Sequence, residues 1–330
     1  MSSLTAIASK QVQLQELIAC ITHFGVDDVS LHLFDHQGRI SPDGVRATIK
    51  ETCGPVRLDV SSFDIGDRQA IRKILEQPAD VVAFPLYRAS AFYRHVPALR
   101  RRGTAIVHVT DGVGDLFTMW ELQRAVIAKS TLALVKGALV IPQLHALRAD
   151  FEFNLFHPRK TPYAKRSLPV GAFPIAAAKR QSLDGLLKAK RPGALVIDGF
   201  DLAAERIAAE LGIESYVATR RDGGIEIDGR LHLDNEIICA EEVLALMRPA
   251  VVVGCPSTSL AAARCLHPGL PSLCVTTPAA LRIRGPRFNT VFRAYAEDFG
   301  IVFARSTEVD VQFDELRASI PDIACDAVCA

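Results

Sequence analysis

One segment, residues 251–263, constrains the fold and the function of this chain more than any other. It begins with three consecutive valines, a β-branched run typical of a buried strand, and Gly254 and Pro256 then end the strand. An Ala/Leu-rich helix follows three hydroxyl residues: Ser257, Thr258 and Ser259. Hydroxyl side chains cap the free N–H groups at a helix start, and the same N–H groups favour a bound anion. The segment therefore predicts either a simple helix cap or a phosphate site that needs no lysine.

Length and composition limit the class of protein. A chain of 330 residues suggests two domains, and 49% hydrophobic with 23% charged residues is ordinary for a globular protein. The net charge of +1 gives no reason to expect a nucleic acid partner. No apolar run reaches about 18 residues, and we expect no signal peptide. The eight cysteines form no CxxC pair or zinc spacing, so we expect a reducing cytoplasm and no metal site.

Strand-like and helix-like segments alternate along both halves of the chain. In the first half we expect strands at residues 4–8, 29–34, 56–60, 81–86 and 104–109, with helices at 11–24, 68–75 and 93–101. In the second half we expect strands at residues 194–198, 215–218, 251–253, 272–275 and 301–304, helices at 202–211 and 240–247, and a polar hairpin at 220–230. This order predicts parallel sheets with right-handed crossovers. No GxGxxG follows the first strand, so a dinucleotide site of the usual kind is not expected.

The predicted fold class is α/β, with two Rossmann-like domains that face each other across a cleft. This is a GT-B-like glycosyltransferase architecture. We assign residues 1–150 to the N-terminal domain, residues 151–193 to an irregular, basic interdomain segment, and residues 194–330 to the C-terminal domain. The last residues are candidates for packing back on the N-terminal domain.

A carboxylate follows the last expected strand of the first half. Asp111 comes directly before Gly112, which places its side chain on a tight turn at the carboxyl end of a parallel strand. Ligands bind at these strand ends, so Asp111 is a candidate general base. It is equally a candidate for an Asx-turn that ends the strand.

Three stretches together resemble bacterial sialyltransferases and polysialyltransferases, which use CMP-activated sialic acid. Residues 4–14 are similar to the family's first strand and its Gln-Leu helix entry. The tripeptide Thr110-Asp111-Gly112 resembles its acidic-acidic-Gly motif, with Thr110 in place of the first acid. The segment from Glu241 to residue 260 resembles its carboxylate helix and Ser-Ser/Thr motif.

The chain departs from this family at one position. The family has a His-Pro motif on the strand before the carboxylate helix, and Thr219 stands where the histidine is expected. One His-Pro pair begins at His157, about a hundred residues before the serine motif, and another at His267, after it. Either His157 reaches the site from the interdomain segment, or Arg220 and Arg221 replace the lost phosphate ligand. The third option is a degenerate donor site.

The resemblance implies an inverting, metal-independent transfer of sialic acid, or a related nonulosonic acid, from a CMP-sugar to a bacterial capsule or lipooligosaccharide. The N-terminal domain would hold the acceptor and the C-terminal domain the donor. The implied catalytic residues are Asp111 and His157. The implied donor-binding residues are Gly112, Thr219, Arg220, Arg221, Glu241, Ser257, Thr258 and Ser259. No cofactor is expected beyond the donor substrate.

Two alternatives remain open at the level of the sequence. The chain could be a non-catalytic nucleotide-binding relative, because the histidine is missing, or it could transfer another CMP-sugar such as Kdo. The expected partners are the CMP-sugar and a glycan acceptor. Peripheral association of a cytoplasmic protein with the inner membrane or with glycan-assembly machinery is a further option.

Overall fold

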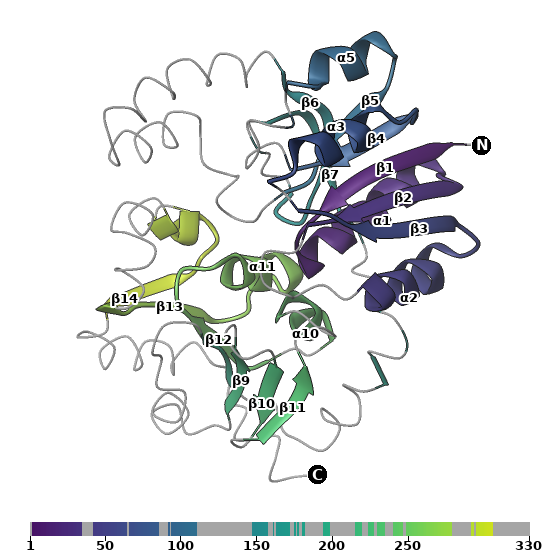
Figure 1. The fold of residues 1–330 in the computed structure, drawn as a ribbon. Coiled ribbons are helices and arrows are strands. Elements are labelled where there is room, and N and C mark those ends of the chain that lie inside the picture. Colours follow the sequence, from purple (N-terminus) through teal and green to yellow (C-terminus); the bar gives the residue numbers. More distant parts are fainter. Residues whose placement is uncertain are drawn as a thin grey trace. The chain divides into compact units, whose positions relative to one another are not determined.

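Figure 1 shows a computed structural model of the chain. It describes residues 2–34, 42–64, 66–85, 94–110, 147–157, 163–171, 194–198, 215–219, 224–227, 230–234, 240–246, 249–278 and 295–305, with a few single positions between them. The chain divides into two compact units, Met1–Ala178 and Lys179–Ala330. Among the described residues, no helix combines the length and the apolar character that a membrane span requires.

The first unit is built on a seven-stranded sheet with the order β3-β2-β1-β4-β5-β6-β7. Every neighbouring pair in this sheet is parallel. The strands are β1 (Ser3–Ala8), β2 (Asp28–Leu33), β3 (Arg57–Ser62), β4 (Val81–Phe84), β5 (Ala105–His108), β6 (Ala149–Asn154) and β7 (Ala164–Pro169). Strands β2 and β3 lie on one side of β1, and the later strands β4 to β7 follow one another on its other side. The predicted Rossmann-like topology of this unit is therefore confirmed.

Helices cover both faces of this sheet because successive side chains of β1 point to opposite sides. Leu4, Ala6 and Ala8 join a core with α1 (Gln11–Phe24) and α2 (Pro42–Cys53). Ile7 joins the opposite core with α3 (Arg68–Glu76) and α5 (Val96–Arg101).

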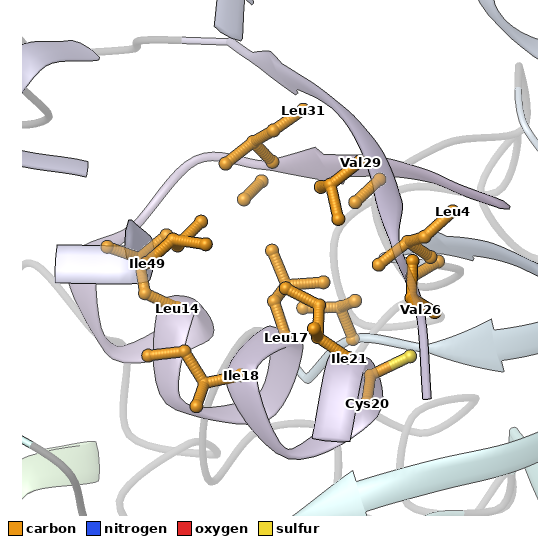
Figure 2. Packing of buried hydrophobic residues seen from close by; sticks show 14 of the residues in the cluster. Leu4, Leu14, Leu17, Ile18, Cys20, Ile21, Val26, Val29, Leu31 and Ile49 are labelled. Atoms are coloured by element: carbon orange, nitrogen blue, oxygen red, sulfur yellow. The ribbon is translucent and has the colours of Figure 1, made fainter. Parts of the chain in front are cut away.

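Apolar residues on α1 recur at the spacing that places them on one face of a helix. Figure 2 shows four of them, Leu14, Leu17, Ile18 and Ile21, pointing into the core beneath β1 and β2. The helix ends at Gly25, whose backbone is left-handed with φ of 57°, and its N–H bonds back to the last turn. The helix predicted at residues 11–24 is thus confirmed with its boundaries.

The second unit also holds seven strands, in the order β11-β10-β9-β8-β12-β13-β14. They are β8 (Ala194–Asp198), β9 (Ser215–Thr219), β10 (Gly224–Ile227), β11 (Arg230–Asp234), β12 (Val251–Gly254), β13 (Ser272–Thr276) and β14 (Val302–Arg305). Strands β8, β9, β12, β13 and β14 are parallel to their neighbours in that set. Strands β10 and β11 run antiparallel at one edge. Two helices, α10 (Ala240–Leu246) and α11 (Thr258–Leu266), flank β12 in the chain.

The structure differs from the prediction at the boundary between the domains. Strands β6 and β7 were expected in an irregular interdomain segment, and both belong to the first sheet. The first unit therefore ends near residue 178 and not at residue 150. Strand β6 was missed because it buries the polar side chains of Glu152 and Asn154, which break the apolar pattern of a strand.

One further helix was not predicted. Helix α2 begins with Pro42 and holds Gly44, both of which indicate a turn in a sequence. The hairpin was predicted at residues 220–230 with a second turn at Asp228-Gly229, and it is confirmed by the antiparallel pairing of β9 with β10 and of β10 with β11. The helix expected at residues 202–211 lies outside the described residues.

Candidate functional site

The candidate donor site is the segment at the junction of β12 and α11, residues 254–259, which includes the last residue of β12 and the first two residues of α11. It is here called the hydroxyl loop. Its approach is apolar, since Val251, Val252 and Val253 are fully buried in β12. Ser257 has extended backbone angles, φ −151° and ψ 160°, and its side chain accepts a hydrogen bond of 3.3 Å from Leu260 N. Ser257 is thus the N-cap of α11, as the first of the two interpretations of this segment requires. The phosphate interpretation remains a prediction.

The hydroxyl loop lies at the point where the order of the second sheet reverses. Strand β8 has β9 on one side and β12 on the other, and all three are parallel. Crevices at the carboxyl ends of such strands are the usual ligand sites of open α/β sheets. Gly254 permits a close approach here, because a Cβ at this position would lie 3.2 Å from Ile197 Cβ and 3.4 Å from the Ile197 carbonyl oxygen.

The carboxylate helix and the hydroxyl loop contact each other directly. Ser259 Oγ donates a hydrogen bond of 2.7 Å to Glu241 Oε1, and the Glu241 residue is only 6% exposed. The neighbouring Glu242 is completely buried. The structure therefore brings together Glu241, Ser257, Thr258 and Ser259, four of the eight residues predicted to bind the donor. The contact gives Glu241 a structural role beside any role in binding.

The second His-Pro pair of the sequence has a structural explanation. His267 is the C-cap residue of α11, and its Nε2 hydrogen-bonds the carbonyl oxygen of Leu244 in α10. Together with the Ser259–Glu241 bond, this contact joins α10 and α11 at both ends. His267 is therefore part of the support of the hydroxyl loop.

The strand beside the hydroxyl loop carries a polar group that the sequence analysis missed. Thr276 ends β13 and is 8% exposed, and its Oγ1 has no hydrogen-bond partner among the described residues. Cys255 and Cys274 lie nearby, and burial raises the pKa of Cys274 well above its ordinary value, with Cys255 adding to the effect. Both cysteines are small apolar side chains in this environment. The sequence could have identified Thr276 as a candidate site residue, because it is the polar residue that ends an apolar strand.

In the first unit, the residue before Asp111 is held by helix α1. Thr110 N donates to Glu16 Oε2 at 2.7 Å, and Thr110 Oγ1 donates to Glu16 Oε1. Gln13 Nε2 donates to the Thr110 carbonyl oxygen at 3.0 Å. Glu16 is 4% exposed and Gln13 is fully buried. Gln13 lies in the stretch 4–14 singled out in the sequence, but the bonds of Gln13 and Glu16 to Thr110 were not predicted, because a polar residue on an amphipathic helix is usually on its exposed face.

Several predicted site residues lie outside the described part of the chain. These are Asp111, Gly112, Arg220 and Arg221. Thr219 is the last residue of β9 and pairs in register with Asp198 of β8, so it lies at a carboxyl strand end of the second sheet.

His157 lies in the first unit and not in a segment between the units. It is exposed in the turn after β6, and its backbone N–H donates to the Asn154 carbonyl oxygen at 3.3 Å. The turn is ordered by a second contact, since Asn154 Oδ1 accepts from Phe156 N at 2.8 Å. The interdomain placement that was predicted for His157 is thus corrected.

Within the described residues, no group of three or more His, Cys, Asp or Glu side chains is arranged to hold a metal ion. A hollow of about 320 Å³ lies in the first unit against α3 and α5, and no predicted site residue lines it. The residues that line it are Leu75, Glu76, His95, Ala98, Arg101 and Arg102.

Comparisons with known proteins find similarity at the level of structure. No protein-family model matches the chain, and no curated protein matches its sequence. The structure of LpCGTa in complex with UDP is similar over 99% of this chain and 94% of that one, with a TM-score of 0.55 and 10% identity.

Two other solved structures align over similar lengths with lower scores. MurG of Acinetobacter baumannii aligns over 98% of this chain and 94% of that one, with a TM-score of 0.44 and 12% identity. A UDP-glucosyltransferase from Polygonum tinctorium, solved in a complex with 3,4-dichloroaniline, aligns over 97% and 94%, with a TM-score of 0.46 and 10% identity.

The similarity to LpCGTa concerns the fold alone, because only 10% of the aligned residues are identical. It covers nearly the whole of both chains, and it agrees with the two α/β units described above, one with a parallel sheet and one with a mostly parallel sheet. The predicted α/β, GT-B-like fold class is therefore confirmed.

Proposed function

We propose that this chain is a glycosyltransferase that transfers sialic acid, or a related nonulosonic acid, from a CMP-sugar to a bacterial cell-surface glycan. The reaction is inverting and metal-independent, and the donor is the only nucleotide that it needs. The capsule and lipooligosaccharide are the candidate acceptors. The GT-B-like fold supports a sugar transferase in general, and the resemblance of the three sequence stretches supports the CMP-sugar.

One observation carries the proposal: the hydroxyl loop leads into the N-terminus of α11 at the carboxyl end of β12. Helix N-termini present N–H groups and a positive dipole end, both of which favour a phosphate. The loop adds three hydroxyl groups, from Ser257, Thr258 and Ser259. A phosphate held in this way needs neither a metal nor a lysine.

In this proposal, Asp111 takes the proton from the acceptor hydroxyl. The acceptor oxygen then attacks the anomeric carbon of the nonulosonic acid, and the bond from that carbon to the CMP phosphate oxygen breaks. Negative charge grows on the phosphate as CMP leaves. Ser257, Thr258 and the helix N-terminus stabilise that charge, and preorganised donors of this kind are usually the largest single contribution to catalysis.

Glu241 supports the donor site in two ways in this proposal. Its carboxylate accepts the Ser259 hydroxyl, which keeps the start of α11 beside the start of α10. A carboxylate also has acceptor capacity for more than one donor, so the same group can accept a ribose hydroxyl of CMP. Gly112 and Thr219 complete the predicted donor contacts.

The positive charge that assists CMP departure comes from Arg220 or Arg221 and not from His157. Both arginines directly follow Thr219, the carboxyl end of β9. An arginine binds a phosphate through two parallel hydrogen bonds and stays charged at every relevant pH. His157 instead follows β6 in the first unit.

The competing proposals are a nucleotide-binding relative without catalysis and a transferase for another CMP-sugar such as Kdo. The first is motivated by Thr219 in place of the family's histidine. A peripheral association of a cytoplasmic enzyme with the inner membrane or with glycan-assembly machinery remains part of the proposal.

A thermal-shift comparison of CMP, UDP, GDP and ADP on the full chain tests the donor class. Binding to the folded protein raises its melting temperature by mass action, and we expect a rise with CMP alone. A rise with UDP and none with CMP would contradict the CMP-sugar and favour a UDP-sugar. No rise with any nucleotide would favour a degenerate donor site.

A further inference from the structure

Thr110 is held at every hydrogen-bonding group that it has. Its N–H and its hydroxyl both donate to the Glu16 carboxylate, and its carbonyl oxygen accepts from Gln13 Nε2. Thr110 is 4% exposed, so these bonds form away from solvent. A buried bond to a charged group is stronger than a neutral one. We refer to Gln13, Glu16 and Thr110 as the Thr110 clamp.

The clamp also reaches the end of β1. Gln13 Oε1 accepts hydrogen bonds from Ser9 N at 2.7 Å and from Lys10 N at 3.1 Å. Strands β1 and β5 are not neighbours in the sheet, because β4 lies between them. One side chain of α1 therefore links the carboxyl ends of β1 and β5 across β4.

A buried carboxylate is costly unless its partners compensate for lost hydration. In the clamp, the two hydrogen bonds from Thr110 compensate the Glu16 carboxylate for its lost hydration. Thr110 directly precedes Asp111, the predicted general base. A general base works only within hydrogen-bond reach of the proton that it removes, and misplacement by about 1 Å can lower the rate about 10²-fold. The backbone that leads into Asp111 thus starts from a residue with little freedom.

We infer that Glu16 and Gln13 are positioning residues that hold Thr110 and thereby orient Asp111 for proton removal. Neither touches the substrates in this scheme. The inference rests on the proposed function, since it assigns a partner to the proposed base. It assigns a task to two buried polar side chains: Gln13, which lies in the stretch 4–14 singled out in the sequence, and Glu16, which lies outside every such motif.

The first unit contains a matched control for the Thr110 clamp. Thr161 N donates to Glu152 Oε1 at 2.9 Å, and Thr161 Oγ1 donates to Glu152 Oε2. Thr161 is 1% exposed and Glu152 is fully buried. The two Thr–Glu pairs have the same chemistry, but Thr161 Oγ1 also accepts a hydrogen bond of 3.3 Å from Tyr163 N, and Thr161 does not precede a predicted catalytic residue.

The experiment compares Thr110→Val with Thr161→Val in the full chain. Each change removes one hydroxyl donor from a buried carboxylate at nearly constant volume. We expect Thr161→Val to lower the urea midpoint of unfolding at least as much as Thr110→Val, because Thr161→Val also removes the acceptor of Tyr163 N. Only Thr110→Val should speed backbone hydrogen exchange at residues 111–113. The kinetic assay measures release of CMP from CMP-sialic acid with water as the acceptor. In that assay only Thr110→Val should lower kcat, by about 10²-fold, with KM unchanged.

Two further variants keep the test decisive if Thr110→Val folds poorly. Thr110→Ser keeps both the N–H and the hydroxyl that donate to Glu16. Its hydrogen exchange at residues 111–113 and its kcat should therefore stay close to the wild-type values. Glu16→Gln retains the size of the side chain and removes its charge, and it should act like Thr110→Val. Equal losses of kcat in Thr110→Val and Thr161→Val would overturn the inference, because a general loss of stability would then explain both.

The exchange measurement separates this inference from the proposed function, because it needs no substrate. Unchanged exchange at residues 111–113 in both Thr110→Val and Glu16→Gln would overturn the clamp whatever reaction the protein catalyses. Faster exchange with an unchanged kcat would overturn its link to Asp111. Failure of the wild-type protein to release CMP would count against the proposed function, and the exchange rates would still decide whether the clamp orders residues 111–113.

Discussion

Ser259 Oγ lies 2.7 Å from Glu241 Oε1, so the first turn of α11 is bonded to the first turn of α10. The two residues are 18 positions apart, and all of β12 lies between them in the chain. Their contact shows that the carboxylate helix and the hydroxyl loop form one structural unit. The spacing of these two stretches in the sequence therefore has a physical basis that does not depend on a bound ligand.

We predict measurable coupling between Ser259 and Glu241. In a double-mutant cycle with Ser259→Ala and Glu241→Gln, the coupling in the free energy of unfolding should be about 1.5–3 kcal/mol, the range for bonds to charged groups. Urea denaturation of the four proteins measures it. The exposed Arg293–Glu297 pair is the control, and its coupling should be only about 0.3–0.5 kcal/mol. Coupling near zero for Ser259 and Glu241 would show that this contact does not stabilise the loop.

The thiol of Cys20 should stay protonated in the folded protein. Burial in the core shown in Figure 2 raises the pKa of Cys20 from 9.0 to about 12. The folded state therefore keeps this proton after the unfolded state has lost it, and the associated stability is lost as the pH rises from about 9 to about 12. The loss approaches about 1.4 kcal/mol per pH unit.

Mass-spectrometric mapping after iodoacetamide treatment at pH 8.5 checks the protonation of Cys20. Native protein should leave Cys20 unmodified, while protein unfolded in urea should be alkylated there. The half-buried Cys53 is the internal comparison, since burial raises its pKa as well but leaves the residue accessible. Alkylation of native Cys20 at the rate of Cys53 would contradict the buried environment.

The backbone plan of the chain could be predicted from apolar spacing. Helix α1 was found because Leu14, Leu17, Ile18 and Ile21 share one face, and the β-branched run before Gly254 identified β12. These signals are local, since each depends only on residues within one element. The parallel order of the strands then followed from the alternation of helices and strands.

Polar side chains with partners far away in the sequence could not be predicted in this way. Glu152 interrupts the apolar pattern of β6, and its partner Thr161 is nine residues away. Glu16 bonds Thr110 across 94 positions. A single sequence does not show which polar residues are buried with partners, so β6 and the Thr110 clamp were both missed.

The proposed base can be tested by Asp111→Asn. Asparagine keeps the size of the side chain but accepts no proton near neutral pH, and the loss of a general base usually lowers turnover about 10²–10⁴-fold. We expect release of CMP from CMP-sialic acid to fall by this factor, with an unchanged calorimetric affinity for CMP. Near-normal turnover in the variant would exclude Asp111 as the base.

The residues after β9 should matter more than His157. We expect Arg220→Ala combined with Arg221→Ala to lower CMP release strongly, and His157→Ala to change it little. Arginine stays protonated, so the pH profile should lack an acidic limb near pH 6.5, the ordinary pKa of histidine. An inactive yet folded His157→Ala protein would contradict this assignment and favour the histidine as the group that assists CMP departure.

The most direct test of the account is calorimetric titration of CMP into the wild-type protein and into the double variant Ser257→Ala, Thr258→Ala. Asp67→Ala is the matched control, because Asp67 caps α3, which has nine residues like α11. Loss of either cap should cost about 1 kcal/mol of stability. Charge-assisted bonds are worth about 1.5–3 kcal/mol each, so we predict CMP affinity at least about 10-fold weaker in the double variant and unchanged in Asp67→Ala. Equal CMP affinity in all three proteins would contradict a phosphate site at the hydroxyl loop and leave Ser257 as a helix cap alone.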